Sequence, residues 1–188
     1  MQVDWIALAR RTIEAPKDAA EEVRALGLSR DVLWTALALS GVLNTFIVVL
    51  LFETSATADG MPLYAASPLA MFFLITGLLV VYVHVLCWPA RALGGEGDLL
   101  DLLALIVWFQ FVRGAAQIVV MLTSLVLPGL ALVLSFAVTL GSFWIFLNFL
   151  AVGMRLNSIT QALVVFVLSG LGIIFGLAVL FSIIGFAA

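Results

Sequence analysis

The chain has 188 residues, of which 65% are hydrophobic and 10% are charged, and its mean hydropathy is +1.29. Soluble domains have about 45–50% apolar and about 25% charged residues, so this composition excludes a soluble globular domain. The formal net charge of −3 argues against a nucleic-acid partner, and a single cysteine, Cys87, excludes a disulfide framework. We therefore expect a chain that lies mainly in lipid.

The first 32 residues are predicted to form a cytoplasmic amphipathic segment that lies at the membrane interface. At about 100° per residue, apolar side chains gather on one helical face and charged side chains on the other. The apolar face includes Trp5, Leu8, Ile13 and Val23. Pro16 is typical of the first turn of a helix, which predicts a bend near Ala15. The segment is interpreted either as an anchor packed on the cytoplasmic face or as a docking surface for a protein partner.

Five apolar runs are each long enough to cross a bilayer, because about 20 helical residues span about 30 Å of hydrocarbon. The predicted spans cover about 33–52, 68–88, 102–127, 130–152 and 160–186. A backbone in hydrocarbon must satisfy its own hydrogen bonds, so all five are expected to be α-helices. The fold class is therefore an all-α integral membrane protein, with a transmembrane domain over residues 33–188.

Basic residues outside the spans predict how the chain is oriented. They occur before the first span, after the second span at Arg91 and after the fourth span at Arg155. The loop at residues 53–67 and the turn at Pro128 have none. Because Lys and Arg favour cytoplasmic loops, we expect a cytoplasmic N-terminus and a C-terminus on the opposite side.

Arg113 is predicted to lie near the middle of the third span. Arg113 lies about 16 Å from the start of that span, in a hydrocarbon core about 30 Å thick. Inserting an arginine at such a depth costs about 2.5–3.5 kcal/mol of free energy. Gln110 and Gln117 share its helical face, and Asn44 in the first span lies at a similar depth. We therefore predict that Asn44 contacts Arg113, from depth alone.

This polar cluster has two interpretations. In the first, Arg113 is part of a site for a ligand, an ion or a lipid headgroup. In the second, Arg113 is structural and its side chain extends along the helix toward the cytoplasmic boundary. There it would meet lipid phosphates or the polar side chains of His84 and Asn148.

The loop before the third span is rich in glycine, with Gly94, Gly95 and Gly97 preceding Asp98. It lacks the Lys and Ser/Thr of a phosphate-binding loop, and no strand precedes it. Asp98 is better interpreted as the N-cap of the third span, with Asp101 in the first turn. The glycines are then expected to allow a tight turn that brings the second and third spans together.

Gly172 and Gly176 lie four residues apart in the fifth span. Small residues at this spacing allow two membrane helices to approach closely. We expect the partner helix to lie within the same bundle, with packing across a homo-oligomer as the alternative.

Motifs of enzymes and metal sites are absent from the sequence. There is no HExxH, no GxSxG and no nucleophile beside an evident base, and His84 is the only histidine. We therefore expect no catalytic residue, no metal and no cofactor.

The order of these features resembles the Yip family of Rab-interacting membrane proteins, in its bacterial branch. The resemblance rests on the Pro-containing amphipathic segment, the glycine loop before the third span, and a fourth span that contains Trp144. That span continues through Gly153, Asn157 and Ser158 into Gln161-Ala162. The resemblance implies five membrane helices with a cytoplasmic N-terminus, here in a bacterial inner membrane. The sequence lacks the long N-terminal region and the Tyr-Gly-Pro motif of eukaryotic members, so Rab binding is not expected.

The favoured functional prediction is a non-enzymatic protein that organises or supports membrane components, as a scaffold or an accessory subunit. Its expected partners are the lipid bilayer, another membrane protein or a second copy of the chain. The alternative is a small transporter, channel or lipid-handling protein that uses the polar cluster around Arg113.

Overall fold

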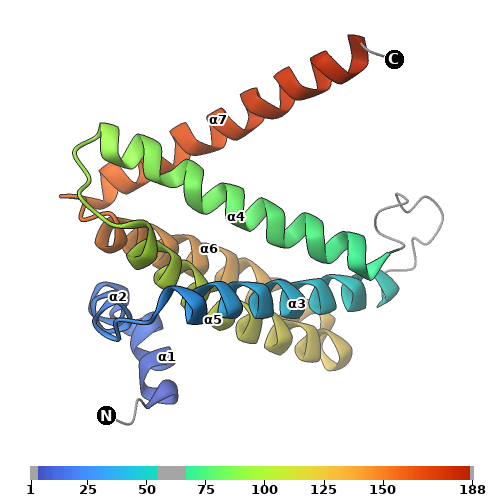
Figure 1. The fold of residues 1–188 in the computed structure, drawn as a ribbon. Coiled ribbons are helices and arrows are strands. Elements are labelled where there is room, and N and C mark those ends of the chain that lie inside the picture. The colour runs from blue at the N-terminus through green and yellow to red at the C-terminus, as the bar shows by residue number, and fades with distance from the viewer. Residues whose placement is uncertain (1–3, 55–66, 187–188) are drawn as a thin grey trace.

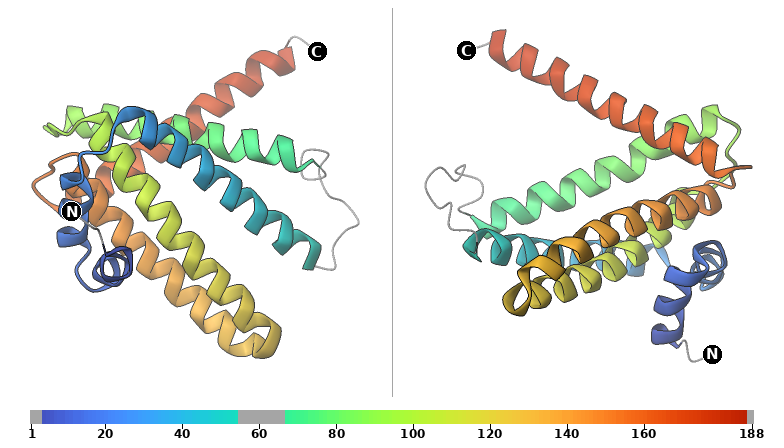
Figure 2. Two further views of the ribbon diagram at one scale, coloured as in Figure 1. Left: turned by 60° about the horizontal axis from the view of Figure 1, so that its bottom comes forward. Right: turned by 180° about the vertical axis from the view of Figure 1, so that it is seen from behind.

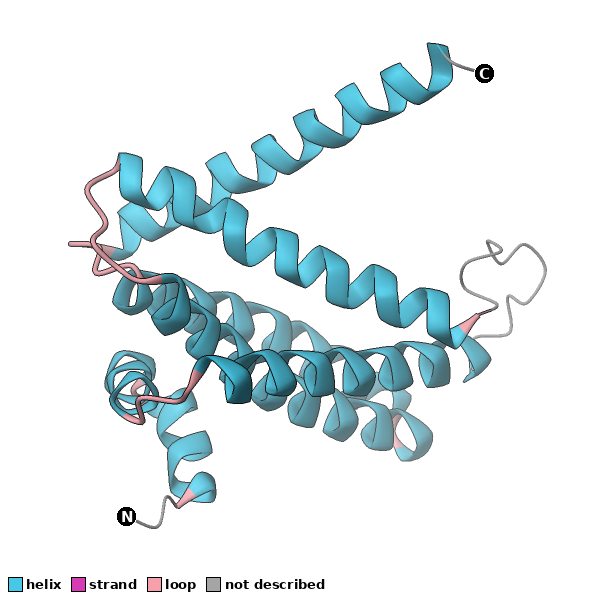
Figure 3. Ribbon diagram, in the orientation of Figure 1, coloured by secondary structure: helices cyan, strands magenta, loops and turns pink. Residues whose placement is uncertain are grey.

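The structure is a computed structural model that describes residues 4–54 and 67–186, and within these ranges all regular elements are helices (Figures 1 and 3). Most of the predicted loop at residues 53–67 lies outside the described residues. The seven helices are α1 (Trp5–Glu14), α2 (Pro16–Ala25), α3 (Arg30–Thr54), α4 (Pro68–Ala92), α5 (Leu99–Val126), α6 (Pro128–Gly153) and α7 (Ile159–Phe186).

Helices α3 to α7 are each long and apolar enough to cross a membrane. They match the five predicted spans in order, and most helix ends extend beyond the apolar runs by one to four residues. Two short helices, α1 and α2, precede them and meet at Ala15, as Pro16 predicted. The all-α fold with five spans is confirmed, and the chain is an integral membrane protein.

The spans begin at residues that suit a helix N-terminus. Pro68 and Pro128 occupy the first turns of α4 and α6, where a missing backbone N–H costs nothing. Ser67 caps α4 by accepting the backbone N–H of Ala70 at 3.3 Å. Asp98 caps α5 by accepting the N–H of Leu99 at 2.7 Å, so the predicted N-cap is present.

The five spans do not form a closed bundle. Helices α5 and α6 form an antiparallel pair, α3 packs against α5 and α4, and α7 packs against α4 and α6 (Figures 1 and 2). We call the end where α3 and α5 begin and α4 and α6 end the basic end, because Arg30, Arg91 and Arg155 lie there. From this end α7 diverges from the other spans, so its C-terminal half stands apart.

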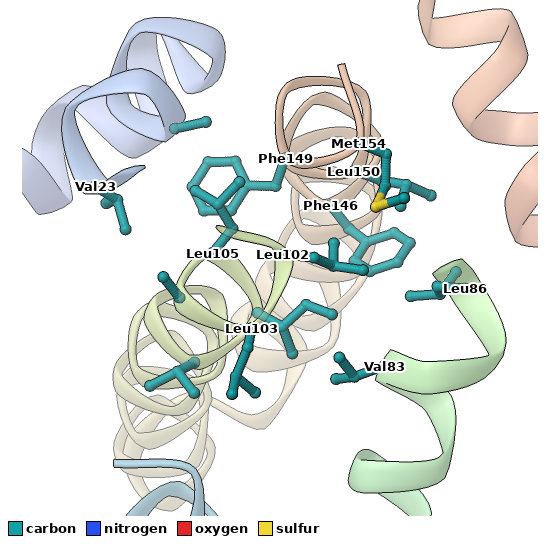
Figure 4. Close-up of a cluster of buried hydrophobic side chains, with 14 of the residues drawn as sticks. Val23, Val83, Leu86, Leu102, Leu103, Leu105, Phe146, Phe149, Leu150 and Met154 are labelled. Carbon is teal, nitrogen blue, oxygen red and sulfur yellow. The ribbon is translucent and has the colours of Figure 1, made fainter. Parts of the chain in front are cut away.

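The hydrophobic core is concentrated at the basic end, where α4, α5 and α6 meet and α2 packs against α5 and α6 (Figure 4). Phe149 and Leu150 of α6, and Met154 directly after it, are each no more than 1% exposed. Leu103 and Leu105 of α5 are fully buried against them. The N-terminal helices and the loops at this end are therefore held by a packed protein interior, whereas the far halves of the spans expose much more of their apolar surface.

The glycine loop makes a tight turn between α4 and α5, which are in contact, and it also packs against the end of α6, a contact that the sequence did not predict. Gly94 has a φ of +86°, a left-handed conformation that glycine adopts at no steric cost. Gly97 donates its N–H to the carbonyl of Met154 at 3.2 Å. A Cβ at Gly97 would overlap the backbone of Gly153 and Met154. The glycine is therefore required where the α4–α5 loop crosses the end of α6.

Candidate functional site

The predicted contact between Arg113 and Asn44 is present. Arg113 of α5 donates from Nη2 to Oδ1 of Asn44 in α3 at 3.2 Å. Asn44 is buried and in turn donates its amide to the carbonyl of Ser40 at 2.8 Å, one turn earlier. Its amide oxygen is therefore oriented for Arg113, a cation–dipole interaction that offsets part of the cost of an arginine inside the membrane.

The two other side chains proposed as partners of Arg113 bond within their own helices. His84 Nδ1 lies 2.7 Å from the carbonyl oxygen of Val80, and its ring stacks on Trp34. Asn148 donates to the carbonyl of Trp144 at 2.8 Å. Short polar side chains in a helix readily bond to the preceding turn, and this local bond leaves neither group directed at Arg113.

A cavity of about 340 Å³ lies beside the polar stripe of α5. Gln110, Arg113 and Gln117 all line it, so three of the four residues of the predicted cluster share one space between α4, α5, α6 and α7, and Asn44 lies outside it. Ser142 and Thr139 of α6 add hydroxyl groups that sequence reasoning did not identify. The remaining wall is apolar and aromatic, formed by Leu79, Tyr82, Ile106, Phe109, Val138, Phe143, Phe146 and Phe166.

The side-chain oxygen of Gln110 is buried without a hydrogen-bond partner among the described residues. An unsatisfied buried acceptor of this kind costs about 1–3 kcal/mol. Arg113 also lines a second cavity of about 220 Å³ between α3 and α5, together with Asn44 and Gln117. Among the described residues no carboxylate lines either cavity, so the site offers one cation, amides and hydroxyls to a group that carries negative charge.

The N-terminal hairpin α1–α2 is fixed to the bundle by one apolar edge. Leu8, Thr12 and Val23 are at most 2% exposed where the hairpin meets α5 and α6. Trp108 of α5 donates its indole N–H to the Thr12 hydroxyl at 2.9 Å. Trp5 packs on the same indole, with ring centroids 5.7 Å apart. The hairpin is therefore part of the protein interior and not only an attachment to the lipid surface.

A second apolar edge of α1 is exposed. Ile6 is 85% exposed and Ile13 is 67% exposed, and both line a groove of about 590 Å³ between α1, α5 and α6. The sequence pattern grouped Leu8 and Ile13 on one face, but the structure separates them: Leu8 packs on the bundle and Ile13 does not. Helical periodicity shows which side chains are apolar but not which neighbour each one meets.

Ion pairs stabilise the polar side of the hairpin. Arg11 of α1 meets Glu22 of α2 at 2.6 Å. A hydrogen bond from Arg10 to Glu14, together with the Glu14 charge, raises the pKa of the Arg10 guanidinium above its ordinary value. Within residues 4–54 and 67–186, no three His, Cys, Asp or Glu side chains gather as metal ligands would.

Asp101 joins the hairpin to the basic end, a role that sequence reasoning missed. Its carboxylate lies 3.9 Å from Nε of Arg24 and 3.8 Å from Nη2 of Arg155. Arg24 also donates to the carbonyl of Val152 at 3.3 Å. Asp101 was expected only to favour the start of its own helix. Nothing in the sequence pairs it with residues so distant along the chain.

The glycines of α7 face open space. A Cβ at Gly172 or Gly176 would meet no atom within 4 Å, and residues 171–179 are exposed except for Ile173. The close packing expected within the bundle is therefore not found among the described residues. Helix α7 leaves α4 beyond Ser169, whose hydroxyl donates to the carbonyl of Val85 at 3.4 Å.

Comparison with known proteins gives one match. The family model described as the Yip1 domain matches residues 10–181, which include most of the hairpin and the greater part of all five spans. Searches of curated proteins and of solved structures give no match.

Proposed function

Because this chain belongs to the Yip1 domain family, we propose that it is a non-enzymatic scaffold or accessory subunit that organises membrane components. The observation that carries this proposal is the two-edged hairpin. One edge of α1 is fixed to the bundle through Leu8 and Thr12, and the other presents Ile6 and Ile13. A surface that is both apolar and rigidly held suits binding, because little conformational freedom is lost when a partner docks.

We place the basic end on the cytoplasmic side of a bacterial inner membrane, with the C-terminus across the membrane. The basic residues at the ends of the spans support this orientation through the positive-inside rule. Helices α1 and α2 lie at this end and cross the direction of the spans, as helices at a membrane surface do (Figures 1 and 2). The exposed edge of α1 then meets headgroup-level lipid and any neighbouring membrane protein.

The test is purification from native membranes with quantitative mass spectrometry of the copurified proteins. We expect a stoichiometric partner with the wild-type chain and its loss in the Ile6→Ser, Ile13→Ser double variant. Glu14→Ser is the matched control, because Glu14 lies on the same helix but outside that edge. Identical partners for all three proteins, or no partner for the wild type, would contradict the proposal.

A second copy of the chain is one such partner, and α7 is the helix we propose for this contact. Its glycines are open and four residues apart, the spacing of close helix pairs in membranes. The mass of the detergent complex should fall when Gly172 and Gly176 are both replaced by Leu. It should not change with Gly77→Leu, because Gly77 is equally open but lies on α4.

Binding of an anionic lipid or solute beside Arg113 is the second candidate function. The observation that favours it is the Arg113 guanidinium in a cavity whose described lining has no carboxylate, and the unpartnered oxygen of Gln110 there can accept from a hydroxyl of the same molecule. Native mass spectrometry should show a retained anionic molecule that Arg113→Leu loses and Arg113→Lys partly keeps. If the arginine is only structural, both variants should carry the same bound molecules as the wild type.

A further inference from the structure

We propose that a separate cavity at the basic end binds a phosphate group. The cavity measures about 310 Å³ and lies between α2 and the turn that joins α6 to α7. Its wall comes from α2, the end of α6, the turn after α6 and the first residue of α7. The polar side chains that line it are Lys17, Glu21, Arg24, Arg155, Asn157 and Ser158.

The basic side chains of this cavity are incompletely neutralised. Arg24 and Arg155 share the single carboxylate of Asp101, at 3.9 Å and 3.8 Å, which is longer than a hydrogen bond. In the part of the chain that the structure describes, Lys17 forms no ion pair. Three cations therefore face two carboxylates, Glu21 in the lining and Asp101 beside it, so the cavity keeps a net positive charge for an anion.

The backbone around Arg155 also favours an anion. Arg155 has a φ of +52°, in the left-handed position after a helix where glycine is usual. An arginine there is a strained choice that places a guanidinium in the cavity wall. Ser158 and Ile159, which also line the cavity, mark the start of α7. This helix has no acidic residue in its first turn, and its N-terminus is capped only by neutral groups, with Ser158 Oγ accepting the N–H of Gln161 at 3.1 Å.

Phosphate is the anion that this set of groups fits best. Two guanidinium groups offer pairs of N–H donors that match phosphate oxygens, and a lysine adds a third cation. The phosphate has two chemical sources at the end of a membrane span: the headgroup of an anionic phospholipid, or a soluble phosphate. The proposal is independent of the scaffold role, because binding to purified protein needs no partner protein.

The experiment measures thermal unfolding of the full chain, followed by the reaction of Cys87 with a thiol reagent. Cys87 is the only cysteine in the sequence and is 7% exposed, so the temperature at which it becomes reactive gives the unfolding midpoint. One arm titrates inorganic phosphate against chloride at equal ionic strength, in phosphatidylcholine bicelles. The other arm replaces part of the phosphatidylcholine by phosphatidylglycerol. A ligand that binds only the folded state raises the unfolding midpoint with its concentration.

The variants separate binding from general salt effects. We expect Lys17→Gln and Arg155→Gly each to reduce the affinity for phosphate about tenfold. This means that about ten times more phosphate is needed for the same rise in midpoint, which corresponds to one lost charge-assisted hydrogen bond. Arg155→Gly is expected to fold, because glycine suits the left-handed backbone. Glu21→Gln should strengthen the response by removing the opposing charge. Arg30→Gln is the matched control, because Arg30 lies at the same end but outside the cavity.

The two arms distinguish the sources of phosphate. A midpoint that rises with inorganic phosphate supports a soluble ligand, and one that rises only with phosphatidylglycerol supports a lipid headgroup. No rise in either arm would overturn the proposal. So would a rise that is the same in wild type, Lys17→Gln and Arg155→Gly, since phosphate stabilises many proteins by exclusion from their surface.

Discussion

Replacement of Gly97 by alanine should destabilise the protein at the contact between the glycine loop and α6. The new Cβ would lie within 3.0 Å of three backbone atoms, at 2.9 Å from the carbonyl carbon of Gly153 and closer still to two others. Real Cβ atoms essentially never approach so closely, and backbone atoms cannot rotate away. Overpacking of this kind costs about 1–3 kcal/mol. The hydrogen bond from Gly97 to Met154, at 3.2 Å, must lengthen as the loop moves, which adds about 0.5–1.5 kcal/mol.

The assay is thermal unfolding in detergent, followed by the reaction of Cys87 with a thiol reagent. Cys87 belongs to the same buried cluster as Met154, so its exposure reports the packing that the variant disturbs. Gly77→Ala is the matched control, because a Cβ there meets nothing within 4 Å. In a helix that change is expected to stabilise by up to about 1 kcal/mol. A Gly97→Ala protein with the unfolding midpoint of the wild type would refute the reasoning.

Two further predictions concern single contacts. Thr12→Val removes the acceptor that the indole N–H of Trp108 has at 2.9 Å. The buried N–H is then unpaired, which should lower the free energy of unfolding by about 1–3 kcal/mol. In a double-mutant cycle, adding Trp108→Phe should recover part of that loss. Gly41→Ala would bring a Cβ against the hydroxyl of Thr76, a side chain that can rotate. It should therefore lower the unfolding midpoint less than Gly97→Ala does, and Thr76→Ala should restore it. Additive effects in the first case, or no rescue in the second, would argue against these contacts.

Depth in the membrane was informative because helix rise fixes it along each span. Arg113 and Asn44 were paired from their distances along two spans, and the structure joins them at 3.2 Å. The same calculation placed His84 and Asn148 near the cytoplasmic boundary, yet both bond to their own helices. Depth restricts which residues can meet, but rotation of each helix about its axis decides which of them do.

The amphipathic hairpin shows where sequence pattern stops being informative. Leu8 and Ile13 are equally apolar and were placed on the same face, but one is 1% exposed and the other 67%. In a helix between lipid and protein, both environments accept an apolar side chain. Hydropathy therefore identifies the face but cannot divide it between the two.

The number, order and approximate ends of the five spans were determined by the sequence alone. A bilayer fixes the length of each span and forces the backbone into helices, so apolar runs and the residues Pro68, Pro128 and Asp98 are sufficient to locate them. Tertiary structure alone decided that Gly97 meets Gly153, that Asp101 joins two distant arginines, and that α7 diverges. The physical reason is that lipid and protein interior are almost equally apolar, so packing of specific shapes, and not hydrophobicity, selects helix neighbours.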